Sequence, residues 1–161
     1  MDDWNPPKIG DIAPEFCLVG RAGEEVCLSR FRGVAEVVLF FYPKDDSPAC
    51  TLEACSFRDD YERFREAGAE VLGISADSPE SHDRFGARHR LPFLLLSDPK
   101  GVTAHRYGVA RTLGLLPGRA TFLIDREGII RHQFSSQFRP LKHVSEMLAV
   151  LGELRSSRPP G

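Results

Sequence analysis

Runs of apolar residues alternate with amphipathic stretches along this chain. Residues 37–42 are apolar without alternation, which is typical of a strand covered on both faces, so we expect this strand to be central in a sheet. Similar short runs predict further strands over residues 69–75, 93–96, 120–125 and 129–134. Because the last two flank Arg126-Glu127-Gly128, we expect them to form a hairpin.

Helices are predicted between and after these strands. Pro48 stands where a first-turn proline is tolerated and Gly68 suits a C-terminal cap, so one helix is expected over residues 48–67. Ser78-Pro79 opens a second helix in the usual order of cap and proline, and a short one is expected over 100–107. A last helix is expected over 141–154. The predicted core stripes are Leu52, Phe57, Tyr61 and Phe64 in the first helix and Val144, Met147, Leu148 and Leu151 in the last. This alternation of strands and helices predicts a mixed sheet with helices on both faces.

Near the start of the chain, residues 16–19 and 26–28 flank a Gly-rich turn and predict a small hairpin. A turn between Arg21 and Gly23 would bring Cys17 and Cys27 opposite each other. A cross-strand disulfide is one alternative. We expect the other, two free thiols that act as small core residues, because free cysteines in strands are most often buried.

Composition narrows the class of protein. With 161 residues, 42% of them hydrophobic, we expect a single domain over residues 1–161 with a disordered tail at 155–161. A net charge of −2 without basic runs argues against nucleic-acid binding, and no stretch approaches the ~20 apolar residues that cross a membrane. The start lacks a basic segment followed by an apolar one, so we expect a soluble, cytoplasmic protein. Neither the four cysteines nor the five histidines have metal-ligand spacing, so we expect no metal and no bound cofactor.

Cys50 is the first candidate for chemistry. It falls in the first turn of the helix over 48–67, after the central strand and a polar loop. Unpaired backbone N–H groups and the positive end of the helix dipole favour a thiolate there. Thiolate is the nucleophilic form of cysteine, so Cys50 is a candidate nucleophile.

Cys55 lies five residues further on. On a regular helix this spacing turns the two side chains ~140° apart and separates their Cα atoms by ~8.7 Å, whereas a disulfide usually needs less than ~7 Å. The helix start must therefore unwind before Cys50 and Cys55 can join. Two such cysteines suit a cycle in which peroxide oxidises the first to a sulfenic acid and the second condenses with it.

The segment Phe-Tyr-Pro-Lys-Asp-Asp-Ser-Pro-Ala-Cys-Thr-Leu-Glu-Ala-Cys, residues 41–55, resembles the active-site segment of peroxiredoxins. The resemblance is to their bacterioferritin-comigratory protein or PrxQ branch and covers about residues 8–154. It implies an α/β, thioredoxin-like fold with peroxiredoxin insertions, in which helices flank a mixed central sheet. Ser47 stands where Thr is commoner but keeps the hydroxyl, and Ala49 stands where Gly is frequent.

The resemblance also implies roles for five residues. Cys50 attacks the terminal peroxide oxygen, while the Ser47 hydroxyl and the Cys50 backbone N–H hold the peroxide. Pro43 shields the thiolate from water, and Arg119, just before the strand at 120–125, orients the thiolate and stabilises developing charge. Cys55 resolves the sulfenic acid.

Simpler interpretations stay open for several of these residues. Ser47 could serve only as a helix cap, Pro43 only as a strand terminator, and Cys55 only as a core residue. Arg58 is expected to pair with an acid such as Asp59 or Glu62, and the Lys44-Asp45-Asp46 segment to form a solvated loop.

The sequence thus predicts a thiol-dependent enzyme that reduces hydrogen peroxide and organic hydroperoxides. The resemblance implies that thioredoxin (or glutaredoxin) recycles it and that it is a monomer. One alternative is a non-catalytic redox sensor or holdase, which would react once per oxidation event. Another is a thiol-disulfide reductase, which the absence of a CxxC pair disfavours.

Overall fold

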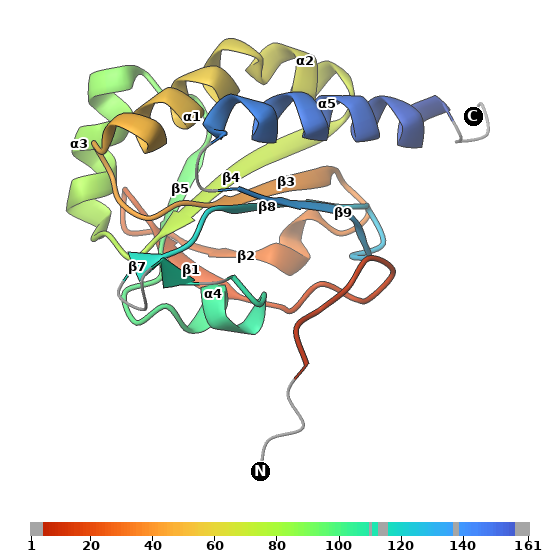
Figure 1. The fold of residues 1–161 in the computed structure, drawn as a ribbon, viewed down its shortest axis with the longest axis horizontal. Coiled ribbons are helices and arrows are strands. Elements are labelled where there is room, and N and C mark those ends of the chain that lie inside the picture. The colour runs from red at the N-terminus through yellow and green to blue at the C-terminus, as the bar shows by residue number, and fades with distance from the viewer. Residues whose placement is uncertain (1–4, 110, 113–115, 137–138, 157–161) are drawn as a thin grey trace.

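A computed structural model describes residues 5–109, 111–112, 116–136 and 139–156. Within this part of the chain, seven strands form one mixed sheet in the order β2-β1-β5-β4-β3-β8-β9 (Figure 1). Their bounds are β1 Cys17–Gly20, β2 Glu25–Cys27, β3 Glu36–Phe41, β4 Ala69–Ser75, β5 Leu94–Ser97, β8 Ala120–Ile124 and β9 Ile130–Ser135. Strands β3, β4 and β5 run parallel, while β1, β8 and β9 are antiparallel to their neighbours.

Strand β3 has the central, buried character that its apolar sequence predicts. All six of its residues are buried, and the side chains of its five apolar residues alternate between two core clusters on opposite faces of the sheet. Helices α1 (Pro48–Asp59), α2 (Tyr61–Glu66), α3 (Pro79–His89) and α5 (Pro140–Ser156) pack on one face. The 3-10 helix η1 (Leu28–Phe31) and helix α4 (Val102–Arg106) cover the other (Figure 1). The predicted mixed sheet with helices on both faces is therefore confirmed.

The helix predicted over residues 48–67 is divided in two. Asp60 leaves helical geometry, with φ −100° and ψ 7°, and its carboxylate pairs with Arg63, so α1 ends before it and α2 begins after it. Leu52 is 51% exposed, so its assignment to the core stripe was wrong. The five-residue step from Leu52 to Phe57 is the reason, because it turns the two side chains ~140° apart.

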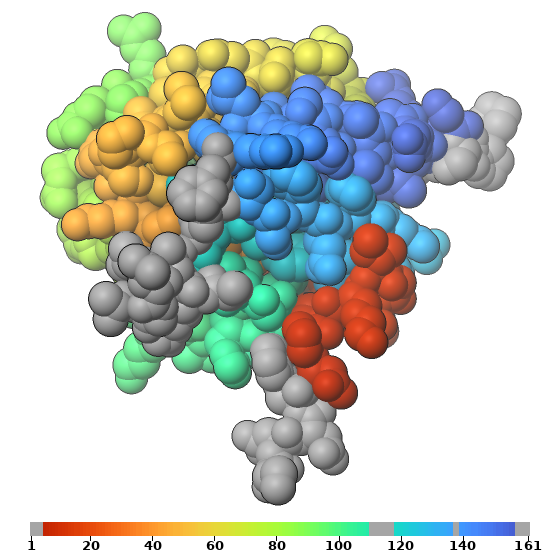
Figure 2. All heavy atoms as spheres, viewed as in Figure 1, coloured from red at the N-terminus to blue at the C-terminus, as the bar shows by residue number. Residues whose placement is uncertain are grey.

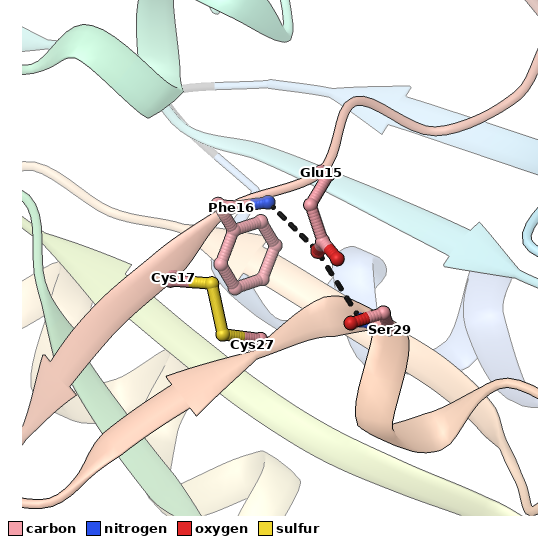
Figure 3. Close-up of a disulfide and its surroundings, with 5 residues drawn as sticks. All are labelled: Glu15, Phe16, Cys17, Cys27 and Ser29. Carbon is pink, nitrogen blue, oxygen red and sulfur yellow. Dashed lines mark hydrogen bonds between the residues drawn. A yellow bond between two sulfur atoms is a disulfide. The ribbon is translucent and has the colours of Figure 1, made fainter.

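The N-terminal hairpin forms as predicted, but its cysteines do not behave as expected. Cys17 and Cys27 are directly opposed and joined by a disulfide, and Cys17 is exposed (Figure 3). The expectation of two free core thiols was wrong because side chains alternate along a strand. Phe16 and Val26 point into the core, so Cys17 and Cys27 face away from it.

The remaining elements follow the predicted order. Ser78 caps α3 by accepting a hydrogen bond from the Ser81 N–H. Two short strands that the sequence did not predict, β6 (Arg111–Thr112) and β7 (Leu116–Pro117), pair with each other. Helix α5 extends to Ser156, so the prediction of a disordered tail was wrong for Arg155 and Ser156. Residues 157–161 of that tail lie outside the described part of the chain. Among the described residues, no helix has the length and apolar character needed to cross a membrane.

Candidate active site

The sheet brings Arg119 to Cys50 although 69 positions separate them in the sequence. Residue Ala120, the first of β8, pairs with Phe41, the last of β3, so Arg119 lies near the end of β3 from which the chain enters α1. Arg119 Nη2 donates a hydrogen bond to Cys50 Sγ at 3.2 Å. Both side chains are almost completely buried, so this contact is shielded from water.

The charge of Arg119 is held in place by its neighbours. Burial alone would lower the pKa of Arg119, but the adjacent Glu53 and Cys50 outweigh it and raise that pKa above its ordinary value. Arg119 Nη1 lies 3.0 Å from Glu53 Oε1. The sulfur of Cys50 therefore faces a permanent positive charge.

The start of α1 leaves backbone donors beside the sulfur. Ser47 is the N-cap residue, yet its hydroxyl makes no capping bond and donates instead to the Lys44 carbonyl at 3.0 Å. The Thr51 N–H donates to the Ser47 carbonyl, and the N–H of Cys50 comes before this first helical bond. Half-buried Pro43 is the second residue after the end of β3. The loop thus supplies a hydroxyl and a free N–H at the helix start.

The loop before Cys50 is anchored rather than solvated. Asp45 is buried, its carboxylate accepts hydrogen bonds from the Tyr42 hydroxyl at 2.6 Å and from the Ser81 hydroxyl at 2.9 Å, and it lies 2.7 Å from His82 Nδ1. Its backbone N–H donates to Asp77. The prediction of a solvated loop was therefore wrong for Asp45, because α3 folds over it.

Asp45, Asp77 and His82 also form a group whose potential metal-ligand atoms lie within 4.8 Å of one another. Sequence spacing did not reveal this group, because its members come from the loop before α1, the connection between β4 and α3, and α3 itself. Each is engaged in hydrogen bonds with protein groups. We therefore interpret the group as the anchor of the loop.

Cys55 lies further along α1 and is a half-buried free thiol. It lines an open surface hollow of about 450 Å³. The other residues of this hollow are Asp46, Pro48, Thr51, Leu52, Arg88 and His89. Cys50 is also a free thiol within the same regular helix, so unwinding of this segment during turnover stays a prediction. Figure 2 shows the surface of α1, in orange, next to α5, in blue.

Arg58 has the structural role expected of it. Its guanidinium pairs with Asp59 at 3.0 Å and donates to the His89 carbonyl at 2.8 Å. Arg58 thereby ties α1 to the end of α3, and its described contacts are with these two groups.

Sequence reasoning missed three residues behind Cys50. Glu53 is fully buried, and burial raises its pKa to about 8 although Arg119 opposes the shift. His143 Nδ1 lies 3.7 Å from Glu53 Oε2, and burial lowers the pKa of His143 to about 4. His143 Nε2 donates to the Ser136 carbonyl, so its Nδ1 accepts from the Thr121 hydroxyl at 2.7 Å.

One of these three carried a sequence signal. Glu53 follows Cys50 by three residues, so the two side chains lie on the same side of the helix. A buried acid beside an expected arginine could have been proposed on that basis. His143 and Thr121 come from α5 and β8, and no spacing relates them to Cys50.

A mixed sheet with a thiol at a helix start beside a buried arginine defines a thioredoxin-like fold of the peroxiredoxin type. The chain belongs to the AhpC/TSA family, whose profile matches residues 9–133. This family and the relatives described next indicate a thiol peroxidase, as the sequence predicted.

Individual relatives agree with this assignment. The chain is 46% identical over 147 residues to the chloroplastic peroxiredoxin Q of Sedum lineare, covering 91% of this chain and 78% of the relative. Among solved structures, peroxidoxin BcpB from Mycobacterium tuberculosis is 37% identical with a TM-score of 0.85, covering 94% of this chain and 99% of that chain. A peroxiredoxin Q from Xanthomonas campestris is 29% identical with a TM-score of 0.80, covering 87% and 91%. The predicted family and fold are thus confirmed.

Proposed function

We propose that this peroxidase reduces hydrogen peroxide and small organic hydroperoxides through Cys50, with Cys55 as the resolving thiol. The observation that carries the proposal is the 3.2 Å hydrogen bond from Arg119 to Cys50 Sγ at the start of α1. It combines a permanent cation, a helix N-terminus and a buried sulfur at one point, which is the environment that favours a reactive thiolate.

In the first step, the Cys50 thiolate attacks the terminal oxygen of the hydroperoxide. The S–O bond forms as the O–O bond breaks, and the leaving alkoxide or hydroxide takes a proton from water. Arg119 and the Cys50 N–H stabilise the charge that develops on the oxygens. The Ser47 hydroxyl already donates to Lys44, so its oxygen accepts the peroxide O–H. Pro43 limits the access of water to the sulfur.

In the second step, the Cys55 thiol condenses with the Cys50 sulfenic acid, forming a disulfide and releasing water. The five-residue spacing within α1 requires the start of the helix to unwind. Asp45 keeps the preceding loop attached to α3 while this happens. Movement is then confined to the chain after Asp45. It includes Asp46, whose exposed ion pair with Arg88 is easily broken.

In the third step, an external dithiol of the thioredoxin (or glutaredoxin) type reduces the Cys50–Cys55 disulfide by exchange. Cys55 lines an open hollow, and this accessibility supports attack at its sulfur. We further propose that the protein acts as a cytoplasmic monomer, which size-exclusion chromatography with light scattering and localisation of the tagged protein would test.

Turnover tests the proposal against a redox sensor and a thiol-disulfide reductase. Peroxide consumption is measured with thioredoxin and its reductase for the wild type, Cys50→Ser and Cys55→Ser. We expect many turnovers in the wild type and loss of turnover in both variants. A single stoichiometric oxidation of the wild type, whether thioredoxin or glutaredoxin is supplied as the reductant, would support the sensor. Reduction of protein disulfides without peroxide consumption would support the reductase.

A further inference from the structure

The disulfide between Cys17 and Cys27 lies toward the opposite edge of the sheet from the Cys50 site. It joins β1 and β2, and the sheet order places β5, β4 and β3 between this hairpin and β8, which Arg119 precedes. The pair is therefore separate from Cys50 and Cys55, which are free thiols in α1. Nothing in the proposed peroxidase cycle uses it.

The backbone holds these two sulfurs together. The Leu28 N–H donates to the Phe16 carbonyl at 3.0 Å, and the Gly20 N–H donates to the Glu24 carbonyl at 2.7 Å. Hydrogen-bonded and non-hydrogen-bonded pairs alternate along an antiparallel ladder, so Cys17 and Cys27 form a non-hydrogen-bonded pair. Side chains approach most closely at such pairs, so two thiols at these positions would be poised to bond again.

The fold of the hairpin has other supports. Its inner face packs into the core through Phe16, Val26 and Leu28. At the same end of the hairpin, the Glu15 carboxylate accepts hydrogen bonds from the Phe16 N–H at 2.9 Å and the Ser29 N–H at 3.1 Å (Figure 3). Because the sulfurs lie on the outer face, opening the disulfide removes none of these contacts.

The disulfide is also accessible to a reductant. Cys17 is exposed, and Cys27 is half-buried at the end of β2. In the described sheet β2 is an edge strand that pairs only with β1. An incoming thiolate therefore reaches the Cys17 sulfur from solvent.

We infer that Cys17 and Cys27 form a second thiol–disulfide exchange centre, which accepts two electrons from a dithiol protein independently of the Cys50 site. A thiolate of the dithiol bonds to Cys17 Sγ, the Cys17–Cys27 bond breaks, and Cys27 leaves as a thiolate that takes a proton from water. The second thiol of the donor then attacks the mixed disulfide and releases Cys17. The donor leaves as a disulfide, and an oxidised dithiol re-forms the pair by the reverse steps.

Glu25 sets the charge at this centre. It lies on β2, and its carboxylate oxygen is within 4.8 Å of both sulfur atoms. A negative charge at this distance opposes the approach of a thiolate, and salt weakens this repulsion. We therefore expect Glu25→Gln to be reduced two- to fourfold faster than the wild type, with Glu24→Gln as the matched control in the neighbouring turn.

The test follows each cysteine pair separately in the folded, full-length protein. The protein is first oxidised with hydrogen peroxide, then treated with thioredoxin, its reductase and NADPH. Free thiols are alkylated and assigned to their peptides by mass spectrometry. We expect reduction of both pairs, so that all four cysteines react, and an unchanged circular dichroism spectrum. The Cys17–Cys27 bond should return when oxidised dithiothreitol is added.

A purely structural disulfide gives a different result. If Cys17–Cys27 stays oxidised after Cys50–Cys55 is fully reduced, or opens only in urea, the inference is wrong. Loss of the folded spectrum on reduction would equally overturn it. Cys17→Ser/Cys27→Ser should keep peroxide consumption within about twofold of the wild type. Because peptides report each pair without peroxide turnover, failure here is distinguishable from failure of the proposed peroxidase cycle.

Discussion

Arg119 and Glu53 are hydrogen-bonded to each other in the buried site, with Arg119 Nη1 donating to Glu53 Oε1 at 3.0 Å, and the same guanidinium donates to the sulfur of Cys50 through Nη2. The planar guanidinium has N–H donors on both of its terminal nitrogens, so it can make both contacts at once. Glu53 thereby fixes the orientation of Arg119, and Arg119 presents a fixed donor to the sulfur. Through Arg119, the buried side chain of Glu53 is thus connected to the reacting sulfur of Cys50.

Replacing Arg119 tests this geometry. In Arg119→Lys the charge remains, but a single ammonium cannot bind Glu53 and Cys50 with the fork of a guanidinium. We expect oxidation of Cys50 by peroxide to slow by about 100-fold, the order seen when one charge-stabilising donor is removed. The rate is measured by quenching with dimedone and quantifying the Cys50 adduct. Arg58→Lys, in the helix α1 that carries Cys50, is the control, and equal rates for the two variants would contradict the assignment.

The raised pKa of Glu53 predicts a pH dependence of stability. Burial raises this pKa from an ordinary 4.5 to about 8, so the folded state holds the proton more tightly than the unfolded chain. The contribution of the Glu53 proton to the free energy of unfolding is fully present below pH 4.5 and is lost as pH rises through about 8. The loss is on the order of a few kcal/mol, because one pKa unit corresponds to about 1.4 kcal/mol.

Glu53→Gln should remove this dependence. Urea unfolding across about pH 5 to pH 9 gives the free energy of unfolding for the wild type and the variant. We expect the wild-type curve to fall more steeply with pH than that of Glu53→Gln. Glu66→Gln, which changes an exposed acid in α2, should follow the wild type. Parallel curves for the wild type and Glu53→Gln would show that Glu53 does not titrate in this range.

Local patterns predicted much of the site. The apolar run before Pro43 and the proline at the start of α1 placed Cys50 at a helix N-terminus, because both signals act within a few residues. The resemblance to peroxiredoxins supplied Arg119, whose distance in sequence hides its place beside Cys50. The paired strands β3 and β8 bring them together.

Other features depend on contacts that a linear pattern does not contain. Asp45 has the sequence context of a loop acid, but it is buried against groups distant in sequence, such as His82, 37 residues later. The hairpin register of Cys17 and Cys27 was readable from the turn. Their outward direction required knowing that Phe16 and Val26 enter the core.

Unwinding of α1 predicts a change in hydrogen exchange. When Cys50 and Cys55 join, their Cα atoms must approach to less than ~7 Å, which a regular helix does not allow. We expect amides of α1 to lose protection in the oxidised protein, while those of α5 keep it. Exchange measured by mass spectrometry on the reduced and peroxide-treated forms checks this. Cys55→Ser, treated in the same way, cannot form the disulfide and should retain protection in α1. Loss of protection in this variant would show that formation of the Cys50 sulfenic acid alone unwinds the helix.

The hydrogen bonds to the Asp45 carboxylate predict how much stability is lost when one of its acceptor oxygens is removed. Both oxygens of Asp45 accept hydrogen bonds, Oδ1 from the Tyr42 hydroxyl and Oδ2 from the Ser81 hydroxyl. In Asp45→Asn one oxygen becomes an NH₂ group, which cannot accept, so at least one buried donor is left unpaired. We expect a loss of about 1–3 kcal/mol in the free energy of unfolding. Asp46→Asn, next in the chain and paired with Arg88 at the surface, should lose less than about 1 kcal/mol.

The two variants also separate anchoring from simple stability. If Asp45 keeps the loop in place while α1 unwinds and refolds, Asp45→Asn should lower steady-state turnover with thioredoxin at a temperature where it remains fully folded. The rate of the first Cys50 oxidation should fall as well, because the Cys50 N–H and the Ser47 hydroxyl come from the same loop and helix start. Asp46→Asn should leave the first oxidation unchanged. Wild-type oxidation and turnover by Asp45→Asn, despite its lower stability, would confine Asp45 to a structural role.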